Sequence, residues 1–567
     1  MAELALPRPV SQPTEGPLDS KFWNMVESDF RRALVRHPML ATFIGIHDHD
    51  DELDDGSRDA LVLDYEEGRQ LLAGLNSIDP AGLSESVRFE RDLALHNVKR
   101  ELFNYETHRV WERRSTAIDG VGDGLFSIFA RDFAPLGERL ASITSRLEAV
   151  PTYLEQHKTR ATAPQVRLWQ ELEIDSGEQM PSLFDEIKAA GHGVLDEKAQ
   201  LRLDKAVQTA SAATAAYVEH VKSGMGSAVE DWALGSKDYD ELVGLRAFDG
   251  LDASQILEIG YEQLALNKEA RVEAARRIDP SVPESVVVDR IKSNQPANFD
   301  AALAAYKDAM LRARAYIIEH DIVTMPPGEQ ISVIPTPEYL RQVIPFAAYF
   351  EPPKFDKHPS GIYIVTPSVG DDPNAMREHN FASISNTSVH EAYPGHHLQL
   401  SAATRHPSLI RLLTDAPEFV EGWGMYSEQM MREQGFDAGP EFMVALRTDA
   451  IWRACRIILD VRMHRGELTV DEATAFLIEH TAFEHANAQA EVFRYTYTPT
   501  YQLSYLLGKV LLLQLRADEQ KRLGDRFSLK NFHDLLMRNG SLPISFHRRL
   551  FAVEAAQAAQ SAEAAGR

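Results

Sequence analysis

The sequence predicts a mostly α-helical protein with one small β-sheet in its second half. Apolar residues recur three and four positions apart over most of residues 18–320, as between Phe22 and Leu34, and again from about 380 to 552. Between about 322 and 370 the chain is rich in proline and contains the β-prone runs 331–334 and 361–365. We therefore expect two helical regions separated by a small sheet or hairpin.

The same patterns divide the chain into four segments. Residues 1–16 are rich in Pro, Ser and Gln, and residues 553–567 contain Ala, Gln and Glu without large apolar side chains, so we expect a flexible arm and a flexible tail. Residues 17–321 are expected to form a helical half that covers a cleft. Residues 322–552 are expected to form a catalytic half that contains the sheet and the helices of the site.

Composition excludes several classes of function. The 59 Lys and Arg residues against 85 Asp and Glu give a net charge of −26, which argues against a nucleic-acid partner. Cys455 is the single cysteine, so any metal must be bound by His, Asp or Glu. The N-terminus lacks a basic start followed by an apolar run, and no stretch of about 18 apolar residues occurs. We expect a cytoplasmic protein without a membrane partner.

The most informative segment is 388–399, with the sequence SVHEAYPGHHLQ. Helices of zinc peptidases commonly carry His-Glu-x-x-His, because residues four apart share one face and the Glu can activate water. Here Pro394 occupies the position of the second histidine, and a proline inside a helix distorts it. Because Gly395 permits unusual backbone angles, the segment can be interpreted as a zinc helix with two residues inserted before its second histidine.

Two histidines compete for the second ligand position. An undistorted helix would favour His397, but seven residues correspond to about 10.5 Å of rise, too far for two rings to share one ion. The distortion favours His396 beside His390, and His397 remains the alternative. A chance His- and Glu-rich helical turn would look similar, since short motifs also match by accident.

A second acidic segment follows at 415–430, DAPEFVEGWGMYSEQM. Asp415 and Glu418 are spaced as in a capped helix start. Glu421 and Glu428 are seven residues apart, so they share one face of the helix among apolar neighbours and need partners there. Two His, one Glu and a water make the open ligand set of catalytic zinc sites, and Glu421 is the predicted third ligand. Glu428 is expected to be a surface carboxylate or one that orients a ligating imidazole.

Taken together, these motifs resemble those of the bacterial domain-of-unknown-function 885 family, and the resemblance extends over nearly the full length of the chain. That family is regarded as a gluzincin-like metallopeptidase group with a helical fold similar to the thermostable carboxypeptidase Taq family. The chain differs from the family's pattern at Gly424, where Ala is usual, and at Thr500-Tyr501, where Gly is common. The matching segments are 41–47, 390–399, 421–426, 494–495, Pro499, Gln502, Tyr505, 508–509, 532–534 and 540–543.

The resemblance implies a large helical metallopeptidase-like fold with a deep central cleft between helical halves. It also implies one zinc ion bound by His390, His396 and Glu421, with Glu391 as general base. It implies no defined substrate.

The segment 491–505 supplies the remaining candidates, because four tyrosines occur there within a short span. A peptidase of this type needs a donor to the oxyanion, for which we choose Tyr505 first and Tyr495 second, with aromatic packing as the alternative. Arg494 is a candidate to pair with a substrate carboxylate, although an internal pair with Glu491 is equally compatible with the sequence. We place Gln502 beside Arg494 as a substrate contact. The run 361–365 is either an edge strand that binds an extended peptide or a packing strand.

Together these patterns predict a zinc-dependent peptidase acting on short peptides, carboxypeptidase-like or oligopeptidase-like, with Glu391 activating water. A zinc hydrolase of a non-peptide amide or ester would share every one of these residues. A catalytically silent metal-binding protein is the other alternative, but it would not need Glu391 for coordination.

Overall fold

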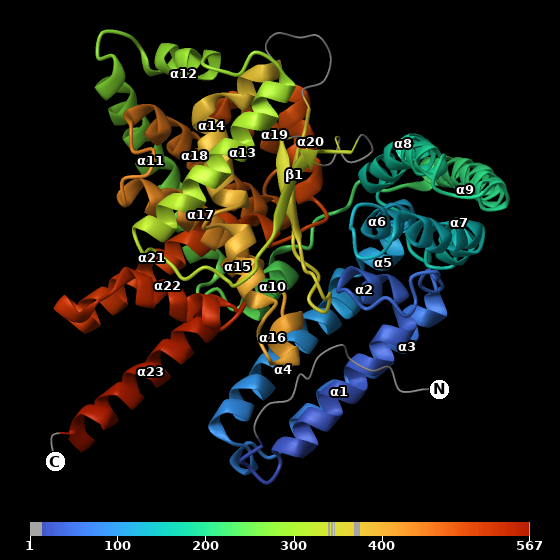
Figure 1. Ribbon diagram of the computed structural model, residues 1–567, viewed down its shortest axis with the longest axis horizontal. Helices are drawn as coiled ribbons and strands as arrows, with labels where there is room; N and C mark the ends of the chain where they lie inside the picture. The colour runs from blue at the N-terminus through green and yellow to red at the C-terminus, as the bar shows by residue number, and fades with distance from the viewer. Residues whose placement is uncertain (1–13, 338–340, 342–343, 345, 368–374, 566–567) are drawn as a thin grey trace.

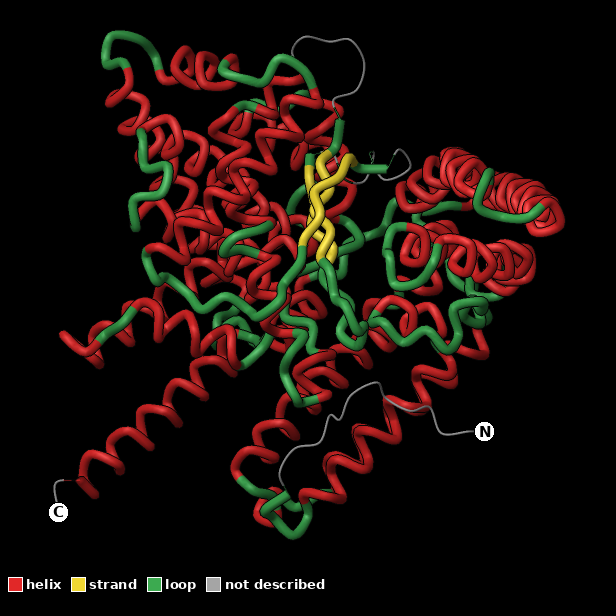
Figure 2. The backbone as a smooth tube through the Cα atoms, viewed as in Figure 1, coloured by secondary structure: helices red, strands yellow, loops and turns green. Residues whose placement is uncertain are grey.

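The computed structural model describes residues 14–337, 341, 344, 346–367 and 375–565. The prediction of a mostly α-helical protein is confirmed, and the described strands form one three-stranded sheet (Figures 1 and 2). The predicted flexible arm falls almost entirely on residues 1–13, outside the described residues.

Helices occupy most of the chain before the sheet. They are α1 Asp19–Arg36, α2 Pro38–Phe43, α3 Arg58–Ser77, α4 Glu85–Phe103, α5 Val110–Arg113, α6 Ala117–Phe129, α7 Leu136–His157, α8 Arg167–Gly191, α9 Glu197–Gly224, α10 Ser236–Arg246, α11 Ala253–Ile278, α12 Glu284–Ser293 and α13 Phe299–Glu319. A single π-helical turn, Asn104–His108, joins α4 to α5.

A second group of helices follows the sheet. They are α14 Phe381–Glu391, α15 His396–Ala403, α16 Leu409–Leu413, α17 Pro417–Glu433, α18 Pro440–His464, α19 Val470–Thr481, α20 His485–Tyr495, α21 Ser504–Leu523, α22 Leu529–Arg538 and α23 Ile544–Ala565. The tail that the composition predicted to be flexible is therefore helical as far as Ala565, and α23 projects from the body of the molecule (Figure 1).

The sheet consists of β1 Ile331–Pro335, β2 Ala347–Phe350 and β3 Gly361–Val365, in the order β1-β3-β2. β1 pairs with β3 in parallel, and β2 pairs with β3 antiparallel. Of the two alternatives for 361–365, the packing strand is confirmed and the edge strand is wrong, because β3 is the central strand and all five of its residues are buried. Both of its edges are already hydrogen-bonded, so it cannot add a substrate strand.

The three largest hydrophobic cores organise the helices. The first joins α10, α11 and α13 to the sheet and to the helices after it, so residues on both sides of the predicted boundary at 321 share one core. A second core lies within α6–α9, which form a separate lobe in Figure 1. A third packs α1, α3 and α4 against Ile410, Leu542 and Phe546. The C-terminal half is thereby connected to the N-terminal helices.

Two glycines bring α17 and α21 into direct backbone contact. A Cβ at Gly422 would lie 2.6 Å from the carbonyl carbon of Gly508, and a Cβ at Gly508 would overlap the carbonyl oxygen of Glu418. Larger residues would force the helices apart, because close-packed backbones leave no room for a side chain. This crossing fixes Glu421 on α17 relative to Tyr505 on α21.

Two helices of this half are followed by glycines with positive φ. Gly435 follows α17 with φ of 102°, and Gly524 follows α21 with φ of 54°. The predicted cap at the start of α17 is wrong: Ala416 is its N-cap, Asp415 binds Arg100, and Glu418 binds Arg246. Ion pairs with distant helices replaced the local cap.

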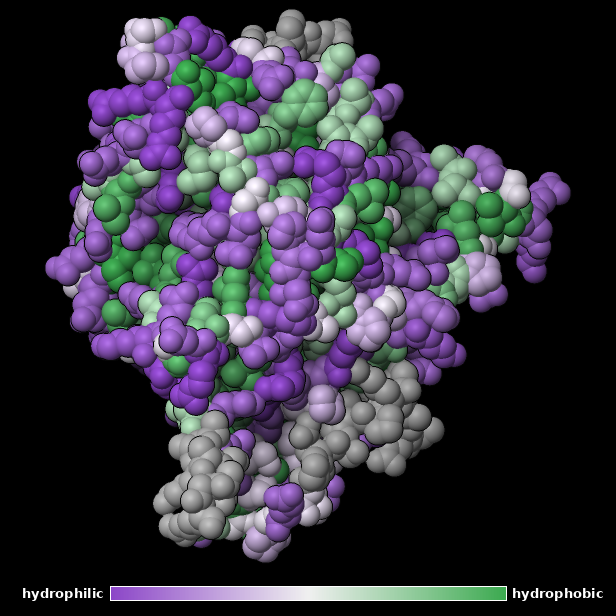
Figure 3. Space-filling view, turned by 60° about the vertical axis from the view of Figure 1, so that its left-hand side comes forward, coloured by the Kyte–Doolittle hydropathy of each residue, from purple (hydrophilic) through white to green (hydrophobic). Residues whose placement is uncertain are grey.

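The surface agrees with the acidic composition. The face in Figure 3 is mostly hydrophilic, with apolar side chains in scattered patches. Among the described residues, none of the helices combines the length and the apolar character needed to cross a bilayer.

Candidate metal centre

The segment 390–396 contains the helix break that the proline predicted. α14 ends at Glu391 and α15 begins at His396, so the two histidines lie on different helices. Gly395 is required by a close approach, because any Cβ there would overlap the carbonyl oxygen of His390. The indole nitrogen of Trp423 on α17 donates to the carbonyl of Pro394 at 2.7 Å, which fixes the turn against α17.

The break brings three predicted ligands together. The potential ligand atoms of His390, His396 and Glu421 all lie within 4.8 Å of one another. Oε2 of Glu421 lies 3.5 Å from Nε2 of His390 and 3.4 Å from Nε2 of His396. These side chains remain 8, 9 and 13% exposed, so the group is enclosed but solvent reaches it.

The structure answers the question between the two adjacent histidines. Nδ1 of His397 lies 2.7 Å from the hydroxyl of Tyr349 on β2, and its ring packs edge-to-face against Tyr349 and Tyr393. His397 is fully buried and does not belong to the group of potential ligands, whereas His396 does. The proline-induced break, rather than a continuous helix, decides which imidazole turns toward Glu421.

Glu428 orients the first imidazole. Its Oε1 accepts a 2.6 Å hydrogen bond from Nδ1 of His390, and its Oε2 accepts from Asn386 at 2.9 Å. This bond directs Nε2 of His390 toward Glu421, the arrangement that carboxylates behind ligating histidines impose in metal sites. Asn386 was not singled out from the sequence, although its position four residues before His390 puts both on one face of α14.

Two carboxylates dominate the electrostatics of the site. Burial would lower the pKa of His390, but hydrogen bonds to Glu421 and Glu428 raise it to about 10. Burial would raise the pKa of Glu421, yet the hydrogen bonds to His390 and His396 hold it well below its ordinary value. The group is therefore a strong cation-binding environment, and a metal ion would compete with protons for the imidazoles.

Glu391, the predicted base, lies beside this group. It is the last residue of α14 and makes no hydrogen bond or ion pair with a described residue. Burial raises the pKa of its carboxyl, and the nearby imidazoles of His390 and His396 act in the opposite direction. A carboxylate without a protein partner next to potential metal ligands is free to bind a water molecule or a substrate proton.

Tyr501 is the residue that the sequence argument missed. Its hydroxyl donates to Oε1 of Glu421 at 3.1 Å, which leaves Oε2 facing the histidines. The preceding Thr500 has φ of 66°, unusual for a β-branched residue, and Asp460 stabilises it by accepting its backbone N–H at 2.9 Å. Glycine would adopt this conformation without the steric cost that Thr500 bears. Nothing in local periodicity distinguishes Tyr501 from its neighbours.

The other candidates from this segment fall into different positions. The ring of Tyr505 packs edge-to-face against that of Tyr501 with centroids 5.9 Å apart, and burial followed by the charge of Glu421 raises the pKa of its hydroxyl, so Tyr505 lies near the potential ligands. Tyr495 is fully buried, and its hydroxyl donates to Glu491 at 2.7 Å. Arg494 pairs with Glu491 at 3.2 Å, the internal pair foreseen for it.

The geometry does not support a substrate contact for Gln502. Its side chain is 0% exposed, and its amide nitrogen donates to Thr498 at 3.0 Å. The residue lies in the short 3₁₀ turn Tyr501–Leu503, whose backbone buries it beneath the surface while Tyr501 faces the site. Tyr495 is likewise a packing residue whose hydroxyl is already bonded.

Gly424 lies against the first histidine. A Cβ at this position would be 2.7 Å from Cε1 and 2.8 Å from Nε2 of His390. The small size of Gly424 therefore affects how closely the imidazole of His390 approaches α17, rather than the shape of a substrate pocket.

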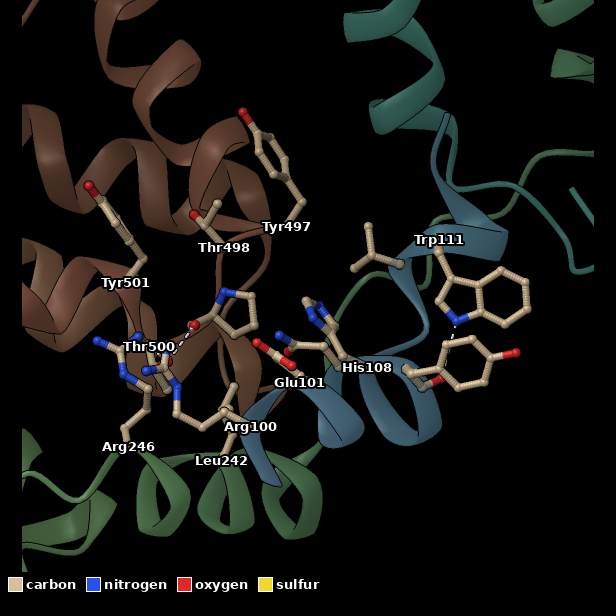
Figure 4. A pocket seen from close by; sticks show the side chains of 14 residues that line it. Arg100, Glu101, His108, Trp111, Leu242, Arg246, Tyr497, Thr498, Thr500 and Tyr501 are labelled. Carbon is tan, nitrogen blue, oxygen red and sulfur yellow. Dashed lines mark hydrogen bonds between the residues drawn. The ribbon is translucent and has the colours of Figure 1, made fainter. Parts of the chain in front are cut away.

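A cavity of about 490 Å³ adjoins the site (Figure 4). One wall comes from α4, the π-helical turn and α5, and the other from α10 and residues 497–501. The potential metal ligands do not line it, but Tyr501 does, and the hydroxyl of Tyr501 binds Glu421. The cavity thus lies between N-terminal and C-terminal helices and is connected through Tyr501 to the candidate metal centre.

Comparisons with known proteins agree with this architecture. A solved structure titled a "putative lipoprotein of unknown function" from Shewanella oneidensis is 21% identical, with a TM-score of 0.75 over 94% of this chain and 99% of that one. A "putative lipoprotein" from Colwellia psychrerythraea is 18% identical, with a TM-score of 0.79 over 94% and 98%. These likenesses establish the fold alone. No curated protein matches. The family model described as "Bacterial protein of unknown function (DUF885)" matches residues 38–550, and the chain belongs to that family.

Proposed function

We propose that this protein is a zinc-dependent hydrolase of short peptides, related to the gluzincin peptidases, in which Glu391 is the general base. The observation that carries this proposal is the convergence of His390, His396 and Glu421 beside an unpaired Glu391. A structural ion would not need that carboxylate, since closed structural sites use four protein ligands.

The donor atoms fit a zinc ion. An ion bound tetrahedrally at about 2.0–2.2 Å separates two of its ligand atoms by roughly 3.3–3.6 Å. The two distances from Glu421 to the imidazoles, 3.4 and 3.5 Å, match that separation and exceed the usual N–H···O length of about 2.9–3.0 Å. Two imidazoles with one carboxylate also favour zinc over magnesium or calcium, which prefer oxygen ligands.

The chain's own residues divide the work of amide hydrolysis. A zinc ion at this position supplies Lewis acidity, which polarises a carbonyl and lowers the pKa of water. Glu391 accepts a proton as the water oxygen bonds to the carbonyl carbon, and then gives that proton to the amine as the carbon–nitrogen bond breaks. Glu428 keeps the imidazole of His390 in the tautomer with Nε2 free.

One tyrosine hydroxyl is available to the developing oxyanion. The hydroxyl of Tyr501 donates its proton to Glu421, whereas Tyr505 packs edge-to-face against Tyr501 and lies near the same carboxylate. A donor aimed at the oxyanion contributes about 2.7–4 kcal/mol of transition-state stabilisation. We assign that role to Tyr505, with Tyr501 positioning it, so Tyr505→Phe should lower kcat by about 100-fold with little change in zinc content.

Metal analysis and two substitutions test the proposal. Protein purified without added metal should contain close to one zinc per chain and should cleave members of a peptide library in a chelator-sensitive manner. Glu391→Gln should retain zinc and lose hydrolysis, whereas His390→Ala should lose both. Glu433→Gln, on the same helix as Glu421 but paired with Arg516 on α21, is the control and should retain both.

Each negative result has a definite meaning. Full activity in Glu391→Gln or His390→Ala would reject the mechanism. Stoichiometric zinc with cleavage of amides or esters but of no peptide would replace the peptide substrate by a non-peptide one. Stoichiometric zinc with no hydrolysis of any kind would indicate a metal-binding protein without catalysis.

A further inference from the structure

The cavity beside the metal centre contains one acidic side chain without a partner. Glu101, near the end of α4, lines the cavity, and its carboxylate makes no hydrogen bond or ion pair with a described residue. In Figure 4 its carboxylate lies between His108 and the segment that carries Thr500. The side chain is exposed to the cavity, yet enclosure by the surrounding helices raises the pKa of its carboxyl. Solvent in the cavity therefore stabilises this charge less well than bulk water does.

The positive charges on the cavity wall are already neutralised. Arg100 binds the side chain of Asp415 at 3.0 Å, and Arg246 binds the buried carboxylate of Glu418 at 2.9 Å. Each arginine thus has its own counter-ion outside the cavity, and Glu101 alone keeps an uncompensated charge among the described lining residues.

The remaining lining is polar or aromatic and does not repel a cation. Burial lowers the pKa of His108 to about 3, so this imidazole is neutral at ordinary pH. Trp111 and Tyr105 stack at 5.1 Å, and Tyr497 completes the opposite wall. These ring faces are already engaged, since Arg114 lies 4.0 Å from the centre of the Tyr497 ring and Tyr65 stacks on Tyr105, so Glu101 is the group that would attract a cation.

The backbone of this wall departs from regular helix. The π-helical turn Asn104–His108 interrupts the passage from α4 to α5, and Arg109 after it has φ of 51°. π-turns are rare and occur frequently at functional sites, where they redirect side chains. Here the irregular turn supplies Asn104, Tyr105 and His108 to the cavity.

We propose that this cavity is a substrate subsite that selects a positively charged group, with Glu101 as its counter-ion. The substrate class is a short peptide that carries a Lys or Arg side chain, or a free N-terminal ammonium, close to the bond that is cleaved. The short distance follows from Tyr501, which contacts both the cavity and Glu421. This assignment deepens the proposed peptidase function and rests on it for the identity of the substrate.

Matched peptides test the selectivity. The first set consists of peptides that are blocked at both ends and differ only in carrying Lys, norleucine or Glu at a scanned position. They are compared with a norleucine peptide whose amino end is free. We expect the cationic peptides to exceed the blocked norleucine peptide in kcat/KM by about tenfold or more, since a hydrogen-bonded charge contributes about 1.5–3 kcal/mol. The blocked Lys peptide and the free-amine peptide distinguish a side-chain cation from a terminal one.

Substitution of Glu101 assigns the selectivity to this cavity. In Glu101→Gln the Lys-to-norleucine ratio should fall to within about twofold of unity, and Glu101→Lys should reverse the preference toward the Glu peptide. Glu106→Gln is the control, because Glu106 lies on the adjoining π-helical turn, accepts from the hydroxyl of Tyr65 and does not line the cavity, and it should keep the wild-type ratio. No cationic preference, or a preference that survives Glu101→Gln, would overturn the assignment.

Binding without turnover separates this inference from the proposed function. The same Lys and norleucine peptides are titrated calorimetrically into Glu391→Gln and into Glu391→Gln/Glu101→Gln. Preferential binding of the Lys peptide that requires Glu101, in a protein whose wild type cleaves no peptide, would support the subsite while rejecting the peptidase. Cleavage without cationic preference would support the peptidase while rejecting the subsite, and absence of both binding and cleavage would reject both.

Discussion

The hydrogen bond between Glu428 and His390 offers a direct test of how the metal centre is held. The two groups meet at 2.6 Å, and Glu428 and His390 are 2% and 7% exposed. Replacing Glu428 by Gln keeps its volume but removes the negative charge that favours the Nδ1–H tautomer. Replacing it by Ala also removes the acceptor and leaves a buried N–H without a partner.

The expected magnitude follows from this contact. Loss of the carboxylate behind a ligating histidine costs 10- to 100-fold in metal affinity, which corresponds to about 1.4–2.7 kcal/mol. We expect Glu428→Gln to lose zinc affinity by about tenfold, the lower value, because its amide oxygen can still accept from His390 once Asn386 reorients. Glu428→Ala should reach the upper value, because the unpaired N–H adds a desolvation penalty of about 1–3 kcal/mol.

Competition with a fluorescent chelator measures zinc affinity directly. The control is Glu433→Gln, which lies on the same helix and should bind zinc as the wild type does. Circular dichroism at the same temperature verifies that each variant is folded. Unchanged zinc affinity in Glu428→Ala would refute the role assigned to this bond, and an equal loss in Glu433→Gln would show that the effect is not local.

Two further outcomes concern the framework of the site, and a third concerns an ion-pair cluster of the N-terminal helices. Trp423→Phe removes the donor to Pro394 and leaves a void, so thermal or urea unfolding should show a loss of about 2–4 kcal/mol, and no loss would contradict the role of that bond. Gly508→Ala should cost at least about 3 kcal/mol in the same assay because α17 and α21 must separate, whereas Gly244→Ala, which meets no atom within 4 Å, should be neutral or stabilising. Hydrogen bonds to two aspartates raise the pKa of His37 to about 9. The protonated imidazole therefore contributes fully to the free energy of unfolding below about pH 6.5, and that contribution is lost as pH rises through 9. His37→Gln should therefore lower stability by about 1–2 kcal/mol at pH 6, discounted for a side chain that is 31% exposed, but not at pH 9.5; equal losses at both pH values would refute the linkage.

The parts of the site that local chemistry determines were predictable from the sequence. Proline cannot continue a helix, so the break before His396 followed from Pro394 alone. Residues seven apart share a helical face, so Glu421 and Glu428 were expected to point the same way. Helix ends at Gly435 and Gly524 follow from the conformational freedom of glycine.

Features that depend on distant packing could not be read in this way. The central position of 361–365 depends on pairing with β2, whose short run of four residues gave no clear signal. Glu418 became the partner of Arg246 on α10, 172 residues away, instead of a cap residue. Tyr501 gained its role from a loop that Asp460 on α18 stabilises, a contact between elements 40 residues apart.

The glycine crossing of α17 and α21 limits how such a site can diversify. Since backbone meets backbone there, no exchange of side chains can lengthen or shorten the span between the carboxylate of one helix and the hydroxyl of the other. Variation in what the molecule accepts would then be confined to the opposing wall, where α4 and its irregular turn carry no part of the crossing. On the proposed function, chemistry and selectivity would be encoded in stretches of the chain more than 300 residues apart.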